Sequence, residues 1–526
     1  MAKPYERRRT FAIISHPDAG KTTLTEKLLL YGGAIHTAGT VKARRAQRAA
    51  TSDWMDLERK RGISVTSSVM HFEFGDIRYN LLDTPGHQDF SEDTYRTLMA
   101  ADCAIMLIDA AKGVETQTRK LFDVCRRRGT PIVTFVNKLD RPARDPLDLM
   151  SQVEDVLGLD TVPCTWPIGS GELFQGVYDR SQQSVLQFER TDKNATQVPV
   201  TVAGIDDPQL ESMLGDGPTG ELRDAMELLD GAGEQYSQEK FLNGKITPVF
   251  FGSALTNFGV EPFLKAFADM CPAPGPREAS TGTVEPGGDD FSGFIFKVQA
   301  NMDPSHRDRI AFLRVCSGKY ESGMRVHHYR LGKEVRLARA EQLMAKERQS
   351  VEEAYAGDII GLYDPGIFRI GDTLTTGKKL SFDSVPRFSP EYFARLTLLD
   401  PMKRKQMQKG IEQLSEEGTM QLFEEPGREK DLILGVVGEL QFEVLAYRLE
   451  HEYGAKVELQ RLGFAHARWV GGAESPQALK SARIAMGVSD QDGRAVGLFR
   501  DDWELRRATD DNPEWTFNAT APIVQG

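Results

Sequence analysis

The sequence predicts an α/β domain with a largely parallel sheet, followed by a β-barrel domain and an α+β domain. Three observations predict this order. A chain of 526 residues is too long for a single hydrophobic core. Stretches rich in proline or glycine near residues 271–290 and 381–390 interrupt the chain, and they sustain neither helices nor central strands. Because the apolar pattern also changes at each stretch, we expect domains over residues 1–272, 290–385 and 390–526.

In the first domain, short apolar runs alternate with longer amphipathic patterns. The short runs are typical of buried strands, and the longer ones have apolar residues at helical spacing. Their alternation implies right-handed βαβ units and a sheet that is covered on both faces. The expected strands are 11–14, 79–82, 104–108 and 131–136, and the expected helices are 22–31 and 116–128.

The two later domains have different patterns. In the middle domain, short strand candidates are separated by glycines, which favours a small antiparallel barrel. In the last domain, strands and helices follow the order of a split βαβ arrangement. The barrel strands are expected at 294–298, 310–315, 324–329 and 359–363; the last domain's strands are expected at 394–399 and 432–437, and its helices at 405–416 and 439–453.

The composition excludes several classes of protein. Asp+Glu 77 against Lys+Arg 65 gives a net charge of −12, which argues against a polybasic protein held to nucleic acid by net charge alone. Apolar runs such as 103–108 are far shorter than the roughly 20 residues that span a bilayer, and the N-terminus has no signal-peptide pattern. The five cysteines are odd in number and widely spaced, as expected for buried thiols in a reducing compartment. We therefore expect a cytoplasmic protein without a membrane partner.

A candidate phosphate-binding loop directly follows the first strand. It matches the Walker pattern GxxxxGK[ST] except that serine stands at its first position. In such a loop, backbone N–H groups face phosphate oxygens at a helix N-terminus, Lys21 neutralises charge, and the Thr22 hydroxyl can bind Mg²⁺. An ordinary strand–turn–helix junction is the alternative interpretation. The candidate residues are Ser15, His16, Pro17, Asp18, Ala19, Gly20, Lys21, Thr22 and Thr23.

A second motif follows the strand at 79–82. Its residues are Asp83, Thr84, Pro85 and Gly86. A carboxylate at a strand end can reach Mg²⁺ through water, and the glycine N–H can sense a γ-phosphate. Alone, this DxxG pattern is usually only a turn, but here it follows a phosphate-binding motif.

A third motif predicts which base is bound. Asn137, Lys138, Leu139 and Asp140 follow the strand at 131–136. One carboxylate can accept both the N1–H and the N2–H₂ of guanine, whereas adenine leaves the carboxylate unpaired, so Asp140 would select guanine. Ser253, Ala254 and Leu255 follow another apolar run and offer a backbone N–H to guanine O6. The ligand is therefore expected to be GTP or GDP.

The order of these motifs resembles the translational GTPases, the family of elongation factors Tu and G. Within that family, the chain is most similar to the GTPases of translation termination, from about residue 8 to about residue 470. The segments that carry the resemblance are Ser15–Thr23, Ser52–Met55, Arg61–Ser64, Phe90–Arg96 and Asn301–Ile310. The length also fits, since elongation factor G has two further C-terminal domains.

The resemblance implies roles for further residues. His87 would position the attacking water, although it could instead be a turn histidine without chemistry. Ser64 would bind Mg²⁺ together with Thr22 and Asp83, in a position where most relatives have threonine; Thr66 or Ser67 would take this role if the register differs. No arginine finger is evident, so an activator in trans is expected.

The resemblance also implies partners. A GTPase of this type would act on the ribosome, promote the recycling of class I release factors, and be a monomer off the ribosome. The basic run Met402–Lys409 is expected to contact rRNA or a ribosomal protein. An inserted subdomain at about 160–245 would resemble that of elongation factor G, and its acidic part at 206–234 is either a solvated surface or a protein-binding face.

Other interpretations are a GTPase subunit of ATP sulfurylase, a nucleotide-binding module without hydrolysis, and an elongation-type or tetracycline-resistance factor. The third domain and the long insert disfavour the first, and Asp83 with His87 disfavours the second. The last would need additional C-terminal domains. Residues 471–526 match no pattern and carry no functional expectation.

Overall fold

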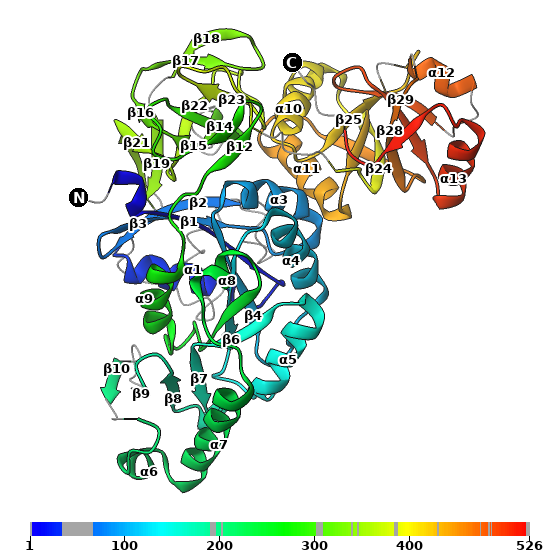
Figure 1. Cartoon of the computed structure of the whole chain (residues 1–526). Coiled ribbons are helices and arrows are strands. Elements are labelled where there is room, and N and C mark those ends of the chain that lie inside the picture. The colour runs from blue at the N-terminus through cyan, green and yellow to red at the C-terminus, as the bar shows by residue number, and fades with distance from the viewer. Residues whose placement is uncertain are drawn as a thin grey trace. The chain divides into compact units, whose positions relative to one another are not determined.

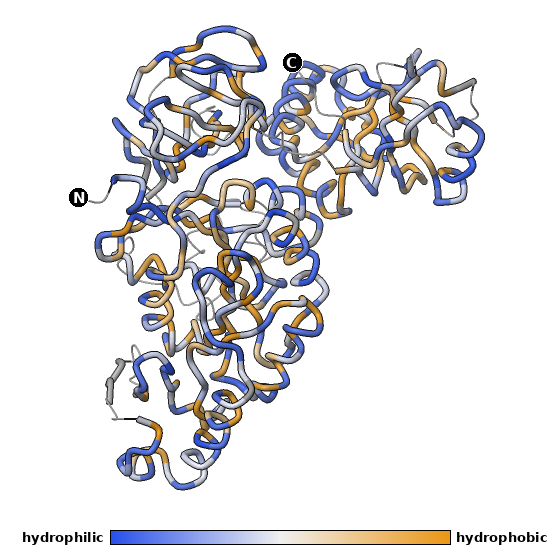
Figure 2. The backbone as a smooth tube through the Cα atoms, in the orientation of Figure 1, coloured by the Kyte–Doolittle hydropathy of each residue, from blue (hydrophilic) through white to orange (hydrophobic). Residues whose placement is uncertain are grey.

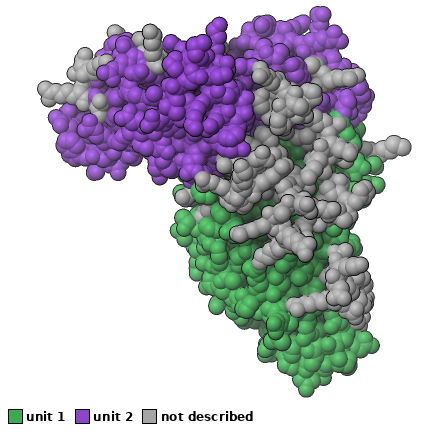
Figure 3. Space-filling model, turned by 180° about the vertical axis from the view of Figure 1, so that it is seen from behind, with its two compact units in different colours: residues 1–87, 100–275, 342–349 green, residues 88–99, 276–341, 350–526 purple. Residues whose placement is uncertain are grey.

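The computed structural model groups the chain into two compact units (Figure 3). Unit 1 comprises residues 1–87, 100–275 and 342–349, and unit 2 comprises 88–99, 276–341 and 350–526. The structure describes residues 3–33, 67–189, 196–200, 204–300, 309–337, 340–344, 347–382, 388–428, 431–473, 475–481, 484 and 486–521.

Unit 1 is built on a seven-stranded sheet of order β2-β3-β1-β4-β5-β11-β6 (Figure 1). All neighbours pair in parallel except β2 and β3, which are antiparallel. Every residue of β4 is buried, as expected for a central strand covered on both faces. The strands are β1 (Arg8–Ser15), β2 (Ser68–Phe74), β3 (Ile77–Asp83), β4 (Cys103–Asp109), β5 (Ile132–Asn137), β6 (Asp160–Pro163) and β11 (Ile246–Phe251).

Helices cover both faces of this sheet. On one face, α1 (Lys21–Tyr31) and α9 (Val260–Met270) bury apolar side chains in the same core as β1 and β4. Helices α4 (Thr116–Arg128) and α5 (Pro146–Leu157) contact each other, and α4 packs against β1 and β4. In Figure 2, hydrophobic residues concentrate along the central strands of unit 1. None of the described helices is long and apolar enough to cross a membrane.

An inserted subdomain separates β6 from β11. It contains a four-stranded antiparallel sheet of order β10-β9-β8-β7, followed by helices. Its apolar side chains form one cluster with residues at the ends of β5 and β11, so the insert shares a core with the nucleotide-binding part. Its elements are β7 (Thr165–Ile168), β8 (Gly176–Asp179), β9 (Ser184–Glu189), β10 (Thr196–Val200), α6 (Gln209–Leu214), α7 (Asp216–Ala232) and α8 (Gln238–Leu242).

Between β13 and the last domain, the strands form a barrel-like antiparallel sheet of order β18-β17-β23-β14-β15-β22-β19-β20. Its long strands β14 and β15 are buried along their full length. The preceding stretch, which the sequence marks only as a linker, forms a short hairpin of β12 and β13. The strands are β12 (Arg277–Ala279), β13 (Gly282–Val284), β14 (Ser292–Ala300), β15 (Arg309–Ser317), β16 (Lys319–Glu321), β17 (Arg325–His328), β18 (Lys333–Arg336), β19 (Ala340–Met344), β20 (Glu347–Val351), β21 (Glu353–Tyr355), β22 (Ile359–Tyr363) and β23 (Thr373–Thr375).

The last part of unit 2 has the predicted split βαβ order, β24-α10-β25-β26-α11-β27, with strand order β27-β24-β26-β25. The C-terminal residues extend this sheet with β29-β30-β28-β31, a part that the sequence did not predict. The predicted fold class is thereby confirmed. The elements are β24 (Tyr392–Leu398), α10 (Arg404–Glu416), β25 (Gln421–Glu424), β26 (Ile433–Val436), α11 (Glu439–His451), β27 (Val457–Leu462), β28 (His466–Gly471), α12 (Pro476–Ser481), β29 (Met486–Asp490), β30 (Ala495–Phe499), α13 (Asp502–Asp511) and β31 (Thr516–Asn518).

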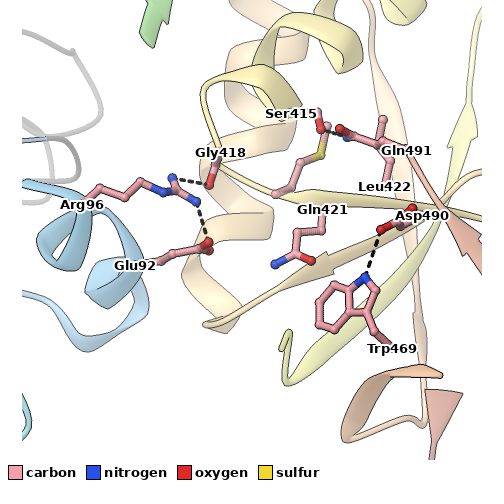
Figure 4. Close-up of a pocket in the computed structure, with 10 residues that line it drawn as sticks. Glu92, Arg96, Ser415, Gly418, Gln421, Leu422, Trp469, Asp490 and Gln491 are labelled. Carbon is pink, nitrogen blue, oxygen red and sulfur yellow. Dashed lines mark hydrogen bonds and ion pairs between the residues drawn. The ribbon is translucent and has the colours of Figure 1, made fainter. Parts of the chain in front are cut away.

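Residues 88–99, which include most of α3 (Ser91–Ala100), pack within unit 2. Asp89 Oδ2 accepts a hydrogen bond of 2.7 Å from the Leu440 N–H, and so caps α11, whose own N-cap is glycine. Arg96 pairs with Glu92 at 2.5 Å and donates to the Gly418 carbonyl at 3.1 Å (Figure 4). The predicted first domain contains this segment by position in the chain, whereas its contacts group it with unit 2.

Candidate active site

The loop between β1 and α1 has the backbone shape of a phosphate cradle. Asp18 and Gly20 both have positive φ, 66° and 101°, and no side chain caps the start of α1. The first N–H groups of the helix are therefore free of side-chain caps, as an anion site at a helix N-terminus requires. A Cβ on Gly20 would lie 2.4 Å from Asn137 Nδ2, so only glycine fits this position.

The second motif lies beside this loop. Asp83 is the last residue of β3 and is in register with Ile13 of β1. Its Oδ1 accepts from Lys21 Nζ at 2.5 Å, and both side chains are almost fully buried. Thr84 Oγ1 donates to the Ile13 carbonyl at 2.7 Å. A Cβ on Gly86 would be 3.7 Å from Pro17 Cα, which places the Asp83–Gly86 turn against the phosphate loop.

Besides Asp83, three predicted residues concern the metal and the attacking water. Thr22 is half-buried in the first turn of α1, one residue after Lys21. His87 is half-buried and directly follows the turn that contacts the phosphate loop. Ser64 lies outside the described residues, as does Thr66, while Ser67 is buried immediately before β2.

Asn137 joins three of the predicted motifs with a single side chain. Its Nδ2 donates to the Ala19 carbonyl at 2.8 Å, and its Oδ1 accepts from the Ala254 N–H at 2.9 Å. The asparagine is buried at the end of β5. Because a planar amide offers a donor and an acceptor in fixed directions, it sets the spacing between the phosphate loop and the loop after β11.

Asp140 and Ser253 form the predicted base-recognition end of the site. Ser253 Oγ donates to Asp140 Oδ1 at 2.6 Å, and the Arg141 Nε lies 4.0 Å from Asp140 Oδ2. Ser253 and Ala254 are fully buried, whereas Leu255 is 46% exposed. The structure thus brings Asp140 together with the start of the Ser253–Leu255 segment and turns the leucine outward.

Comparisons with known proteins agree with this geometry. A family model described as the elongation factor Tu GTP binding domain matches residues 6–273. A model of elongation factor G domain 2 matches 290–377, and the C-terminal domain of class II release factor RF3 matches 382–509. "Peptide chain release factor 3" of Symbiobacterium thermophilum is 58% identical over 523 residues, which is 99% of both chains. The chain belongs to the release factor 3 family of translational GTPases.

Further relatives of the release factor 3 family give the same result. The protein of that name from Acaryochloris marina is 55% identical over 100% of this chain and 97% of its own. The one from Gloeobacter violaceus is 54% identical over 99% of both chains. A crystal structure of a protein from Thermus thermophilus has a TM-score of 0.68 at 24% identity, covering 88% of this chain and 69% of that chain, and it shows a shared fold. The predicted family, GTPase activity and binding of GTP and GDP are confirmed.

In this release factor 3 family member, sequence reasoning missed Asp109. Lys138, at φ 73°, pairs through Nζ with Asp109 Oδ2 at 2.7 Å and also donates to the Asp18 carbonyl. Asp109 ends β4, the strand between β1 and β5. An acidic residue at the carboxyl end of a buried strand between two motif strands was the available signal.

The insert is hydrogen-bonded to the base-recognition motif. Leu139 donates its N–H to the Gly252 carbonyl at 3.2 Å, and its carbonyl accepts from the Gly171 N–H at 2.8 Å. Gly171 belongs to the insert and has a φ of 65°. Both backbone groups of Leu139 are therefore satisfied, one by the loop after β11 and one by the insert.

Proposed function

We propose that this chain is a ribosome-stimulated GTPase of translation termination that promotes dissociation and recycling of class I release factors. It hydrolyses GTP to GDP and phosphate, works in the cytoplasm, and is a monomer off the ribosome. The family assignment supports the activity. The observation that supports the site best is the Asn137 side chain, which bonds to both the phosphate loop and Ala254.

The site residues have distinct proposed roles. The loop Ser15–Thr23 binds the phosphates through backbone N–H groups, and Lys21 neutralises their charge. Asp140 accepts the two guanine donors, and the Ala254 segment faces guanine O6. The proposed residues remain those of the sequence motifs: Ser15, His16, Pro17, Asp18, Ala19, Gly20, Lys21, Thr22, Thr23, Asp83, Thr84, Pro85, Gly86, His87, Asn137, Lys138, Leu139, Asp140, Ser253, Ala254 and Leu255.

Mg²⁺ fits the oxygen donors of this site. Magnesium commonly uses one or two protein oxygens together with substrate phosphates, and it would offset phosphate charge. Thr22 and Asp83 are the described donors, and Ser64 is the third proposed ligand. The Lys21–Asp83 pair keeps the carboxylate beside the phosphate loop.

His87 is the proposed residue that orients the attacking water. It directly follows Gly86, whose added Cβ would lie 3.7 Å from Pro17 Cα, so the histidine is next to a segment that lies beside the phosphate loop. Phosphoryl transfer to water depends mainly on positioning and charge stabilisation, which a neighbouring imidazole and an activator in trans can supply.

The test measures GTP hydrolysis with and without 70S ribosomes, together with dissociation of a labelled class I release factor. Ribosomes should increase turnover by orders of magnitude, and release-factor dissociation should require GTP. His87→Ala should lose the stimulated rate but keep GDP affinity, while His451→Ala, on the exposed end of α11, should behave like the wild type. A wild-type rate that ribosomes leave unchanged would overturn the proposal.

A further inference from the structure

The start of α10 carries four basic side chains that form no ion pair with the part of the chain that the structure describes. They are Lys403, Arg404, Lys405 and Lys409, here called the α10 basic surface. Arg404, Lys405 and Lys409 are exposed, and Lys403 is half-buried. From residue 401 to residue 411 the sequence contains no acidic residue. The chain thus concentrates positive charge here although its net charge is −12.

The charge distribution of α10 opposes its own dipole. A helix N-terminus carries partial positive charge, so basic residues in the first turn destabilise it. Lys405 and Lys409 are also spaced i,i+4, where like charges repel. At the other end of the helix, Glu416 pairs with Arg309, and the C-cap residue Glu417 pairs with Arg448. These two glutamates therefore stabilise the fold through ion pairs, whereas the basic residues destabilise the N-terminal end of α10.

Acidic groups near the surface are occupied by other contacts. Asp400 Oδ1 accepts from the Met402 N–H at 3.0 Å and caps the 3₁₀ turn Pro401–Lys403. Glu412 Oε1 accepts from Gln408 Nε2 at 3.2 Å. Among the described residues, neither carboxylate forms an ion pair with the α10 basic surface. The positive charge of that surface therefore remains available to an external anion.

Exposed apolar side chains adjoin the cations. Met402 is 85% exposed and Leu399 is 52% exposed. The Leu399 N–H donates to the Lys456 carbonyl at 3.1 Å, which brings the start of β27 beside this surface.

Three of the four cations of the α10 basic surface are lysines. Lysines on flexible side chains suit a row of phosphates, because an ammonium binds phosphate as a point charge without a fixed pairing geometry.

We infer that the α10 basic surface binds the phosphate backbone of a structured RNA. The inference rests on the proposed function, in which the ribosome supplies that RNA. Contacts of this kind position a protein without reading sequence, and they weaken as salt displaces them. Binding to phosphate would also relieve the repulsion within the first turns of α10.

The test compares Lys405→Gln/Lys409→Gln with a matched double variant, Lys378→Gln/Lys379→Gln. The control removes the same charge from two exposed lysines elsewhere in unit 2. Affinity for 70S ribosomes is measured with a non-hydrolysable GTP analogue over a range of KCl concentrations. The α10 variant should bind about 10-fold more weakly at low salt, and its log–log salt slope should be smaller by roughly 0.7–0.9 per lost phosphate contact. The control should match the wild type.

Thermal unfolding separates binding from a structural role. Because the lysines oppose the helix dipole, the α10 variant should have a Tm equal to or above that of the wild type. A lower Tm, or unchanged ribosome affinity and salt slope, would overturn the inference. Weaker binding with an unchanged salt slope would also overturn the inference. So would cross-linking from position 405 to a ribosomal protein instead of rRNA.

The failure of the proposed function gives a different pattern. If the wild type binds ribosomes but shows no stimulated hydrolysis, the proposed function fails while the α10 comparison still stands. If the wild type does not bind ribosomes, titration with deproteinised 16S and 23S rRNA tests the surface directly. Loss of rRNA binding in the α10 variant alone would then support the inference, and equal binding or no binding by all three proteins would overturn it.

Discussion

Lys138 and Asp109 connect the ends of two neighbouring parallel strands through an ion pair of 2.7 Å between Nζ and Oδ2. Burial raises the pKa of the Asp109 carboxyl, but the hydrogen bonds from Lys138 and the Ala111 N–H outweigh it and leave the pKa below its usual value. Since Lys138 also donates to the Asp18 carbonyl, Asp109 positions the lysine that supports the phosphate loop.

Asp109→Asn should therefore weaken nucleotide binding without abolishing the fold. The amide keeps the shape of the carboxylate but removes a charge-assisted hydrogen bond worth about 1.5–3 kcal/mol. GDP affinity should fall about 10-fold or more, as measured by fluorescence titration. Asp155→Asn, on the exposed side of α5, is the control and should bind GDP like the wild type. Equal affinities in all three proteins would contradict the positioning role.

The lowered pKa of Asp109 also predicts a pH dependence. A carboxyl with a lower pKa in the folded state contributes stability above its unfolded pKa of about 3.9, and this contribution is lost as pH falls through the folded pKa. The free energy of unfolding should differ between wild type and Asp109→Asn by about 1–3 kcal/mol at pH 7, with the difference shrinking below about pH 4. Chemical denaturation at several pH values measures this, and a difference that stays constant would contradict it.

Gly20→Ala should be far more damaging than a glycine substitution of similar backbone conformation. At Gly20 a Cβ is strained by the positive φ and also meets Asn137 Nδ2 at 2.4 Å, whereas Gly129, at φ 65°, has no neighbour within 4 Å. We expect losses in unfolding free energy of about 2–4 kcal/mol for Gly20→Ala and about 1–2 kcal/mol for Gly129→Ala. GDP binding should fail only in the first, and comparable defects in both would refute the steric explanation.

Asp140→Asn should change base preference. An amide can donate to the C2 carbonyl of xanthine but cannot accept both guanine donors. The variant should therefore pair with xanthine and leave one guanine donor unpaired. GDP affinity should fall on the order of 100-fold while XDP affinity rises. Competition binding with both nucleotides measures the change. A variant that binds both GDP and XDP more weakly would instead indicate that Asp140 positions the loop through its hydrogen bond with Ser253.

Gly438→Ala should disturb the capping of α11 by Asp89. A Cβ at Gly438 would lie 2.2 Å from Asp89 Cβ and 2.4 Å from its Cα, so the backbone of the Asp89 segment has to move. Overpacking of this kind costs about 1–3 kcal/mol. Gly463→Ala, which meets nothing within 4 Å, should stay within about 0.5 kcal/mol of the wild type in thermal or urea unfolding. Two equally stable variants would contradict the close approach.

Much of the fold was predictable because many of its helices and strands have a clear apolar periodicity in the sequence. The helix expected at 116–128 coincides with α4, and the strand expected at 359–363 coincides with β22. These elements have consistent periodicity and clear ends. The C-terminal strands β28 to β31 were not predicted, because short strands that complete a sheet depend on distant partners.

The candidate site was predictable to a different degree. Motif spacing predicted Asp83 at the end of a strand, Lys21 at the start of the helix after the first strand, and Asp140 just after a third strand. These positions share one edge because parallel strands present their carboxyl ends there. Motif spacing could not show that Asn137 bonds to Ala19 and Ala254, because those contacts depend on loop conformations after three different strands. Asp109 was missed because a single aspartate at a strand end belongs to no spaced motif, and its pairing with Lys138 is visible only in the structure.

The placement of residues 88–99 has a practical consequence for dissecting this protein. A truncated chain ending near residue 275 would retain α3 but lose Gly418 and Leu440, the residues to which Arg96 and Asp89 bond. The Glu92–Arg96 pair, each 5% exposed in the intact chain, would then face solvent. The GTP turnover of such a truncated chain would therefore be measured on a nucleotide-binding half whose α3 lacks these native contacts.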